Sequence, residues 1–378
     1  KLNLSEKWRK RLAFDELLSN FLIFNKLKKK TKQKNFLKIS DFSFSNNILN
    51  KLDFELTEDQ KNTFKEIKRD LMGNEKMYRL IQGDVGSGKT IISLLAIADC
   101  VNSGCQAVLM VPTELLAKQH LEYFEKYFKD IKIELLTGNT KQKERIYEDI
   151  KNDKIKILIG THSVYNKAIK FKNLGIIVID EQHKFGVKQR INLIEKSIDC
   201  HTLIMSATPI PRSLSFVMYG EIKVSNIKTK PKGRKEVTTS IISDKQIENL
   251  ISGIKRKLEK QEQIFWILPN IGEDIIDIDS DKETVKTRYE FLKKIFGSKV
   301  GIIHGKMNKE EILNNMKDFK EKKTKILIST TVIEVGINIP SATLMIVEEA
   351  NKFGLAQLHQ LRGRISRSDK LSNFVLIH

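Results

Sequence analysis

The amino-acid sequence predicts an α/β protein with two tandem domains of mostly parallel sheets, preceded by a helical N-terminal segment. Short apolar runs alternate with helical patterns in two successive series, which is typical of parallel strands joined by helices. A stretch over 222–236 that is rich in lysine separates the two series and is predicted to be an exposed linker. The 378 residues are enough for two or three domains, each with its own core.

The alternation divides the chain into three segments. Residues 1–50 are predicted to be a helical basic linker segment, because apolar residues at helical spacing precede a lysine run over 26–38. That run is either a solvated face or an arm that contacts phosphates, and the sequence leaves both interpretations open. A first domain over 51–230 has predicted strands at 78–82, 107–111, 132–136, 155–159, 176–180 and 201–205, with helices at 58–72, 90–102, 114–128, 140–151 and 186–197. A second domain over 231–378 has predicted strands at 237–242, 263–268, 299–303, 325–329, 343–347 and 373–377.

The composition limits the class of protein. Lysine and arginine number 67 against 47 aspartates and glutamates, and a net charge of +20 favours a polyanionic partner. Three cysteines without C-x-x-C spacing argue against a disulfide framework or a structural zinc site. No apolar run approaches the roughly 18 residues of a membrane span, and nothing resembles a signal peptide, so we expect a cytoplasmic protein. The sequence begins at Lys1 without a methionine, and we expect it to be a piece of a longer chain.

The most specific motif fits the pattern G-x-x-x-x-G-K-[ST] between an apolar run and a helical pattern. Its residues are Gly83, Asp84, Val85, Gly86, Ser87, Gly88, Lys89 and Thr90. Glycines let the backbone curl so that its N–H groups point at phosphate oxygens, and a helix N-terminus adds partial positive charge. Lys89 is predicted to reach the β- and γ-phosphates of a nucleoside triphosphate, and Thr90 to place its hydroxyl on Mg²⁺.

Further candidate catalytic residues follow other apolar runs. Asp180 and Glu181 end the run 176–179, where Asp180 is predicted to bind Mg²⁺ and Glu181 to orient and deprotonate the attacking water. His183 is placed to sense the γ-phosphate. Near the C-terminus, Arg364 and Arg367 are predicted to project across an interdomain cleft as arginine fingers that stabilise transition-state charge.

Taken in order, these motifs resemble those of superfamily 2 helicases, and more closely those of the RecG type. The stretches that carry the resemblance are GDVGSGKT at 83–90, PTELLAKQH at 112–120, IDEQHKFGV at 179–187, SATPIPRSL at 206–214, HGKM at 304–307, TTVIEVGINIP at 330–340 and FGLAQLHQLRGRISR at 353–367. The resemblance implies two RecA-like P-loop domains, use of ATP and Mg²⁺, and a monomeric motor core that remodels branched DNA in recombination and repair. It also implies that the N-terminal wedge and the C-terminal coupling element of that family lie outside this sequence.

The resemblance assigns further residues. Gln60 is expected to help recognise adenine, and Gly336 and Gln360 are expected at the nucleotide site. The DNA track is expected at Pro112, Thr113, Glu114, Thr137, Gly138, Thr161, His162, Thr330 and Thr331. Short hydroxyl and backbone N–H groups suit phosphate contacts that do not read the base sequence. Asn338 stands where this family usually has aspartate, and Ser366 where it usually has glycine.

Three alternatives remain beside this interpretation. The transcription–repair coupling factor has a related motor, but Gln182 and His359 are similar to the RecG type. A nucleotide-dependent clamp without motor activity would not need Glu181, Arg364 and Arg367. A small-molecule P-loop kinase needs neither a second sheet nor the arginine-rich motif. Only the family resemblance favours DNA over RNA.

Overall fold

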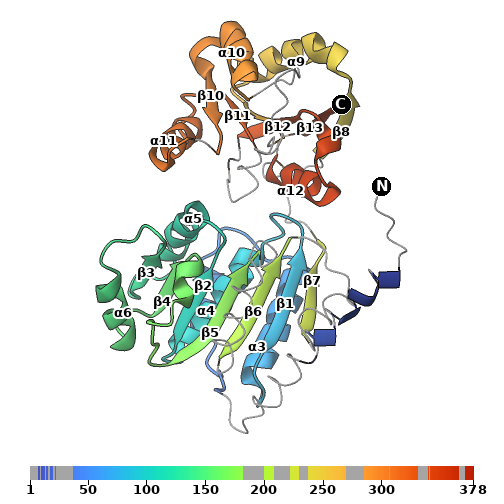
Figure 1. Cartoon of the computed structure of the whole chain (residues 1–378). Helices are drawn as coiled ribbons and strands as arrows, with labels where there is room; N and C mark the ends of the chain where they lie inside the picture. Colours follow the sequence, from blue (N-terminus) through green and yellow to red (C-terminus); the bar gives the residue numbers. More distant parts are fainter. Residues whose placement is uncertain are drawn as a thin grey trace. The chain divides into compact units, whose positions relative to one another are not determined.

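The computed structural model describes residues 37–181, 200–207, 222–229, 237–269, 285–305, 307–330, 339, 341–365 and 371–378, together with part of 7–22. The chain divides into two compact units, Lys1–Pro231 and Lys232–His378 (Figure 1). Each unit is built on a parallel sheet, which confirms the predicted α/β architecture with two tandem RecA-like domains. Within the described part of the chain, no helix is both long enough and apolar enough to cross a membrane.

The first unit has a seven-stranded sheet with the strand order β3-β4-β2-β5-β6-β1-β7 (Figure 1). The strands are β1 (Tyr78–Gly83), β2 (Gln106–Met110), β3 (Ile133–Leu136), β4 (Ile157–Gly160), β5 (Leu174–Asp180), β6 (His201–Ser206) and β7 (Lys223–Ile227). The helices are α2 (Ser43–Asn50), α3 (Glu58–Met72), α4 (Lys89–Asn102), α5 (Glu114–Glu125) and α6 (Lys143–Lys151), with the short helix η1 (His162–Tyr165). Because all pairs are parallel, the carboxyl ends of these strands lie at one edge of the sheet.

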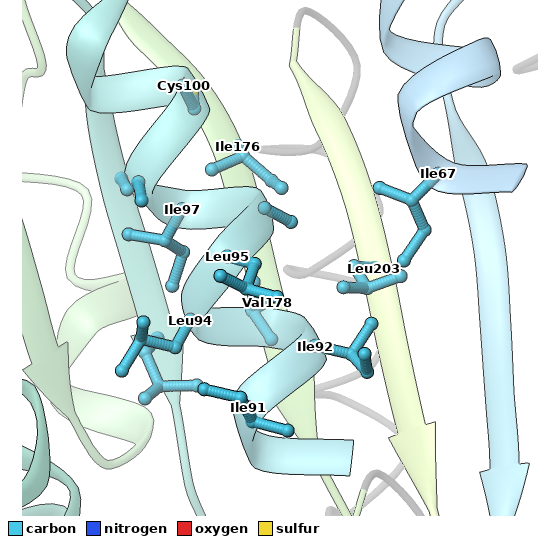
Figure 2. Packing of buried hydrophobic residues seen from close by; sticks show 14 of the residues in the cluster. Ile67, Ile91, Ile92, Leu94, Leu95, Ile97, Cys100, Ile176, Val178 and Leu203 are labelled. Carbon is cyan, nitrogen blue, oxygen red and sulfur yellow. The ribbon is translucent and has the colours of Figure 1, made fainter. Parts of the chain in front are cut away.

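The inner strands of this sheet, such as β2, β4, β5 and β6, are buried on both faces, which explains their nearly continuous apolar sequences. Neighbouring residues on β5 alternate between two core clusters, with Val178 in one cluster and Ile177 in the other. Helices α3, α4 and α5 contribute to the first cluster, and α6 contributes to the second. Figure 2 shows α4 running along the strands of the sheet, with Ile92 beside Leu203 and Ile67 of α3 on the other side of Leu203. The helix that begins at the glycine-rich loop is therefore anchored along its length in the core.

Residues 37–50 pack onto this unit instead of leaving it. Ile39 and Ile48 are fully buried in the core cluster of α3 and α4. The Ser45 backbone N–H donates to Asp99 Oδ1 at 3.1 Å on α4. His201 Nδ1 accepts from the Met77 N–H at 3.0 Å, so Nε2 carries the proton and donates to the Leu37 carbonyl at 2.9 Å. This part of the predicted linker segment is thus integral to the first unit.

Strand β7 corrects the sequence analysis, which assigned 222–236 to an exposed linker. It pairs with β1 at the edge of the sheet, and its polar side chains are held by charged partners. Arg79 Nη1 donates to Ser225 Oγ at 2.6 Å, and Lys223 forms an ion pair with Asp70 at 2.7 Å. Periodicity missed this strand because an edge strand stabilised by hydrogen bonds does not need an apolar sequence.

The second unit has a six-stranded parallel sheet with the order β10-β11-β9-β12-β13-β8 (Figure 1). Its strands are β8 (Val237–Ile242), β9 (Gln263–Ile267), β10 (Val300–Ile303), β11 (Ile326–Ser329), β12 (Ala342–Val347) and β13 (Ser372–Ile377). Its helices are α9 (Ile247–Glu259), α10 (Val285–Phe296), α11 (Lys309–Lys320) and α12 (Leu355–Ile365), with the short helices η4 (Asp244–Gln246), η5 (Gly297–Lys299) and η7 (Ala350–Lys352). If the strands of each unit are numbered from one along the chain, both sheets have the order 3-4-2-5-6-1, and the first sheet adds β7 at its edge. The two units are therefore two copies of one topology.

Candidate nucleotide and nucleic-acid sites

The glycine-rich loop leaves β1 at Gly83 and enters α4 at Lys89. Gly86 and Gly88 have φ of 79° and 87°, a left-handed conformation that only glycine adopts at little cost. Lys89 Nζ donates to the carbonyls of Gly83 at 2.6 Å and Asp84 at 2.9 Å, so its ammonium group lies within the loop. Backbone amides, a helix N-terminus and this ammonium group together fit the phosphates of a nucleotide.

Gln60 reaches this loop from the start of α3. Thr57 caps α3 in a capping box, in which the Gln60 side chain accepts from the Thr57 N–H at 2.9 Å. Its Nε2 donates to the Ser87 carbonyl at 2.7 Å. A Cβ atom on Gly88 would lie 2.1 Å from this Nε2, so glycine is required here for space as well as for φ. The predicted adenine-recognising residue therefore lies against the predicted phosphate loop.

The acidic pair lies at the end of β5, separated from β1 by β6 alone. Asp180 is the last residue of β5, and Glu181 follows in a left-handed conformation with φ of 50°. The Glu181 N–H donates to the Met205 carbonyl at 3.0 Å, and its Oε2 accepts from the Ala207 N–H at 3.3 Å. The Ser-Ala-Thr stretch is therefore bonded to the predicted catalytic glutamate through its alanine.

His120 belongs to this site, although the sequence analysis did not single it out. Its Nε2 lies 3.6 Å from Asp180 Oδ2, and the two side chains are 7% and 14% exposed. His120 is on α5, and its ring packs edge-on against Phe124. The only signal in the sequence was its position at the end of the PTELLAKQH stretch.

The residues predicted for the DNA track in the first unit lie at the carboxyl ends of three neighbouring strands. Pro112, Thr113 and Glu114 follow β2, Thr137 and Gly138 follow β3, and Thr161 and His162 follow β4. Thr113 caps α5 by accepting from the Leu116 N–H at 3.4 Å. Asn139 Nδ2 donates to Glu114 Oε2 at 2.9 Å and so joins the first two segments. The Thr161 N–H donates to the Leu136 carbonyl at 3.2 Å and joins the third.

In the second unit, the described candidates are largely buried. Thr330 follows β11 and is 5% exposed. Gln360 and Arg364 lie on α12 and are 6% and 8% exposed. His183, Thr331, Gly336 and Arg367 lie outside the described residues, as do Gln182, Asn338 and Ser366.

The end of β12 carries a second acidic pair that the sequence analysis did not interpret. Glu348 Oε1 lies 2.7 Å from Arg288 Nε of α10, and both side chains are less than a tenth exposed. Burial raises the pKa of Glu348 to about 7, although the Arg288 charge opposes this shift. Glu349 has φ of 46° and forms an ion pair with Lys352.

The described residues contain no group of three His, Cys, Asp or Glu side chains that could hold a metal ion by themselves. Magnesium is usually bound by one or two carboxylates together with substrate phosphates, so such a cluster is not required. The Asp180 carboxylate and the Thr90 hydroxyl have the oxygen donors that Mg²⁺ prefers, and both lie near the predicted phosphate loop.

Comparison with known families defines the class of protein. Residues 57–217 match the DEAD/DEAH box helicase family, and residues 256–369 match the helicase conserved C-terminal domain. The fold also matches a variant of S. cerevisiae Dbp5 bound to RNA and ADP BeF3, with a TM-score of 0.67 and 19% identity over 92% of this chain and 90% of that one. These matches define a two-domain helicase core.

Within this class the chain is homologous to RecG helicases. Over 99% of its length it is 43% identical to the ATP-dependent DNA helicase RecG of Aquifex aeolicus. The match covers 48% of that helicase. A structure of RecG bound to a three-way DNA junction matches with a TM-score of 0.78 and 38% identity, over 98% of this chain and 49% of that one. The chain thus spans about half the length of the relatives it matches.

Proposed function

We propose that this chain is the ATP-driven motor of a helicase that remodels branched DNA. The observation that carries the proposal is the convergence of the glycine-rich loop, Gln60 and the Asp180–Glu181 pair at one edge of the first sheet. Its homology to RecG helicases, one of which has been solved with a three-way DNA junction, supports branched DNA as the substrate.

Each group at this edge has a proposed role. Lys89 binds the β- and γ-phosphates of ATP, and Gln60 contacts adenine. Thr90 and Asp180 hold Mg²⁺, which neutralises charge on the phosphate oxygens when it is bound. Glu181 orients the attacking water and accepts its proton, and its bond to the Ala207 N–H keeps the carboxylate in place for that role.

DNA is proposed to run over the ends of β2, β3 and β4. The segments that carry Thr113, Thr137 and Thr161 are joined there by the Asn139–Glu114 and Thr161–Leu136 hydrogen bonds. Their threonine hydroxyls and backbone N–H groups suit contacts to phosphates. In the second unit, Thr330 and Thr331 are proposed to continue this track. Arg364 and Arg367 are proposed to stabilise the charge that develops on the transferred phosphate.

ATP turnover measured with forked DNA, linear duplex, single strands and RNA tests this proposal. We expect stimulation by DNA and none by RNA, with Lys89→Ala as the inactive control. Stimulation by RNA alone would contradict the assignment of DNA as the partner. Turnover that is equal in the wild type and in Lys89→Ala would contradict the assignment of the nucleotide site.

A further inference from the structure

The two units share an arrangement at the end of their fifth strand. In each, a nitrogen-bearing side chain from the helix after the second strand lies against an acidic side chain at that end. Ile179 pairs with Met110 on β2, and Val347 pairs with Ile267 on β9. Since the two sheets share one strand order, Asp180 and Glu348 occupy equivalent positions. Helices α5 and α10 are equivalent as well, because each follows the second strand of its sheet.

The two contacts differ in strength and charge. Arg288 Nε lies 2.7 Å from Glu348 Oε1, whereas His120 Nε2 lies 3.6 Å from Asp180 Oδ2. Arginine is always charged and neutralises the carboxylate that it contacts. An imidazole offers a single N–H in the direction of the acid without a permanent charge. A contact through Oδ2 alone leaves the other carboxylate oxygen of Asp180 available for another ligand.

We propose that His120 is a positioning residue that holds Oδ2 of Asp180, so that the other carboxylate oxygen is directed to Mg²⁺. This inference rests on the proposed function, which makes Asp180 the metal ligand. Partners that hydrogen-bond to a metal-binding carboxylate fix its orientation, and their loss typically costs 10–100-fold in metal affinity or activity. The distance of 3.6 Å is longer than a hydrogen bond, and sites without ligand often tighten on binding.

The surroundings of His120 support this role. The side chain is 7% exposed, and its ring stands at 74° to Phe124, with centroids 6.3 Å apart. Phe124 is fully buried and stacks on Phe128, so the wall beside the imidazole is rigid. A ring held in this way keeps its Nε2 aimed at Asp180. Hydrophobic packing alone does not require a nitrogen at this position.

The test compares His120→Leu, which removes the nitrogen, with His120→Gln, whose amide can still donate toward Asp180. Ile150→Ala is the matched control, because it truncates a fully buried side chain of α6 in the core cluster that does not include Phe124. Binding of Mn²⁺, in the presence of a non-hydrolysable ATP analogue, is followed by electron paramagnetic resonance. Thermal unfolding of each variant reports its stability.

We expect Mn²⁺ affinity to fall by about 10–100-fold in His120→Leu and to recover in large part in His120→Gln. Ile150→Ala should unfold at a lower temperature but bind Mn²⁺ like the wild type. Wild-type Mn²⁺ affinity in folded His120→Leu would overturn the inference, and so would an equal loss in Ile150→Ala. If His120→Leu does not fold, a loss in His120→Gln as large as that in Asp180→Asn overturns it.

Asp180→Asn separates this inference from the proposed function. Loss of Mn²⁺ binding in Asp180→Asn but not in His120→Leu would leave the metal site in place and remove His120 from it. Unchanged Mn²⁺ binding in Asp180→Asn would instead show that the assignment of the metal site itself is wrong.

Discussion

The two units carry an acidic pair at the same place in the same fold, but they use it differently. Asp180 and Glu181 end β5, and Glu348 and Glu349 follow β12 at the equivalent position. The second residue of each pair is left-handed, with φ of 50° in Glu181 and 46° in Glu349. Because both units have this left-handed residue at the same place, the bend is a feature of the shared topology. The residues that contact each acidic pair therefore determine what the pair does.

The partners of the two pairs differ in charge and in burial. Glu181 accepts from the Ala207 N–H, a neutral backbone donor that helps to hold the carboxylate in place. Glu348 is 5% exposed and lies against Arg288, whose guanidinium is also over the Trp266 ring. Burial lowers the pKa of Arg288 as it raises that of Glu348, so both charged forms are costly. The pair in the second unit is therefore structural.

Replacing Lys89 by alanine tests whether the first unit hydrolyses ATP, and it should have the largest effect on turnover. We expect Lys89→Ala to abolish ATP turnover, because water cannot replace a fixed charge within the phosphate loop. The measurement is the steady-state release of phosphate. As a control, Lys352→Ala removes the ion-pair partner of Glu349 in the second unit and should leave turnover unchanged. Comparable losses in both variants would erase the distinction between the units.

Arg288→Met tests whether the second pair is structural. Removing one partner of a buried ion pair typically costs about 3–5 kcal/mol, because the other charge stays buried. In a Trp8→Phe background Trp266 is the remaining tryptophan, so urea unfolding followed by its fluorescence reports the second unit.

The double variant Arg288→Met with Glu348→Leu is the control for that loss. Replacing both charges should restore most of the stability, since a buried ion pair often contributes little relative to apolar groups. A double variant that is as unstable as Arg288→Met would show that packing, and not the unpaired charge, causes the loss.

The pKa of Glu348 predicts how pH acts on the second unit. Its folded pKa of about 7 lies above the ordinary 4.5, so between these values the folded state binds more protons than the unfolded state. Stability should therefore fall by up to about 3 kcal/mol as pH rises through this window. Unfolding followed by Trp266 should show this fall in the wild type and not in Glu348→Gln. The same slope in both would contradict the buried state of Glu348.

The first unit should respond differently, because two of its groups oppose one another. Burial lowers the pKa of His201 to about 4, so its contribution to stability rises as pH increases toward 6.5. Burial raises the pKa of Asp99 to about 6, and its contribution falls over much of the same window. His201→Gln should remove the rising contribution and keep the falling contribution of Asp99. The melting temperature of the first unit should then decrease as pH rises from 4 to 6.

Asp59 holds the end of β7, a strand with no counterpart in the described part of the second unit, and its replacement should give the smallest effect. Its carboxylate accepts from the N–H groups of Lys228 and Thr229 at 2.9 and 2.8 Å, and these bonds lower its pKa. We expect Asp59→Ala to speed amide exchange at both residues by about tenfold, equivalent to roughly one hydrogen bond. Glu58→Ala, in the same turn of α3, should leave exchange unchanged.

The sequence predicted the strands that periodicity and buried apolar runs define, including all six of the second sheet. It missed β7, because Ser225 and Lys223 depend on Arg79 and Asp70 and not on an apolar pattern. The glycine-rich loop and the acidic pair were predictable, since their spacing follows from local geometry. The His120–Asp180 contact was not, because 60 residues separate the partners and only the folded helix brings them together.

The most direct measurement compares ATP turnover in Glu181→Gln and Glu349→Gln, the same substitution at the same place in both units. General-base catalysis contributes about 10²–10⁴-fold, so Glu181→Gln should lose turnover by this factor and still bind a fluorescent ATP analogue. Glu349→Gln should hydrolyse ATP like the wild type, with and without forked DNA. Near wild-type turnover in Glu181→Gln, or an equal loss in Glu349→Gln, would contradict the assignment of the chemistry to the first pair alone.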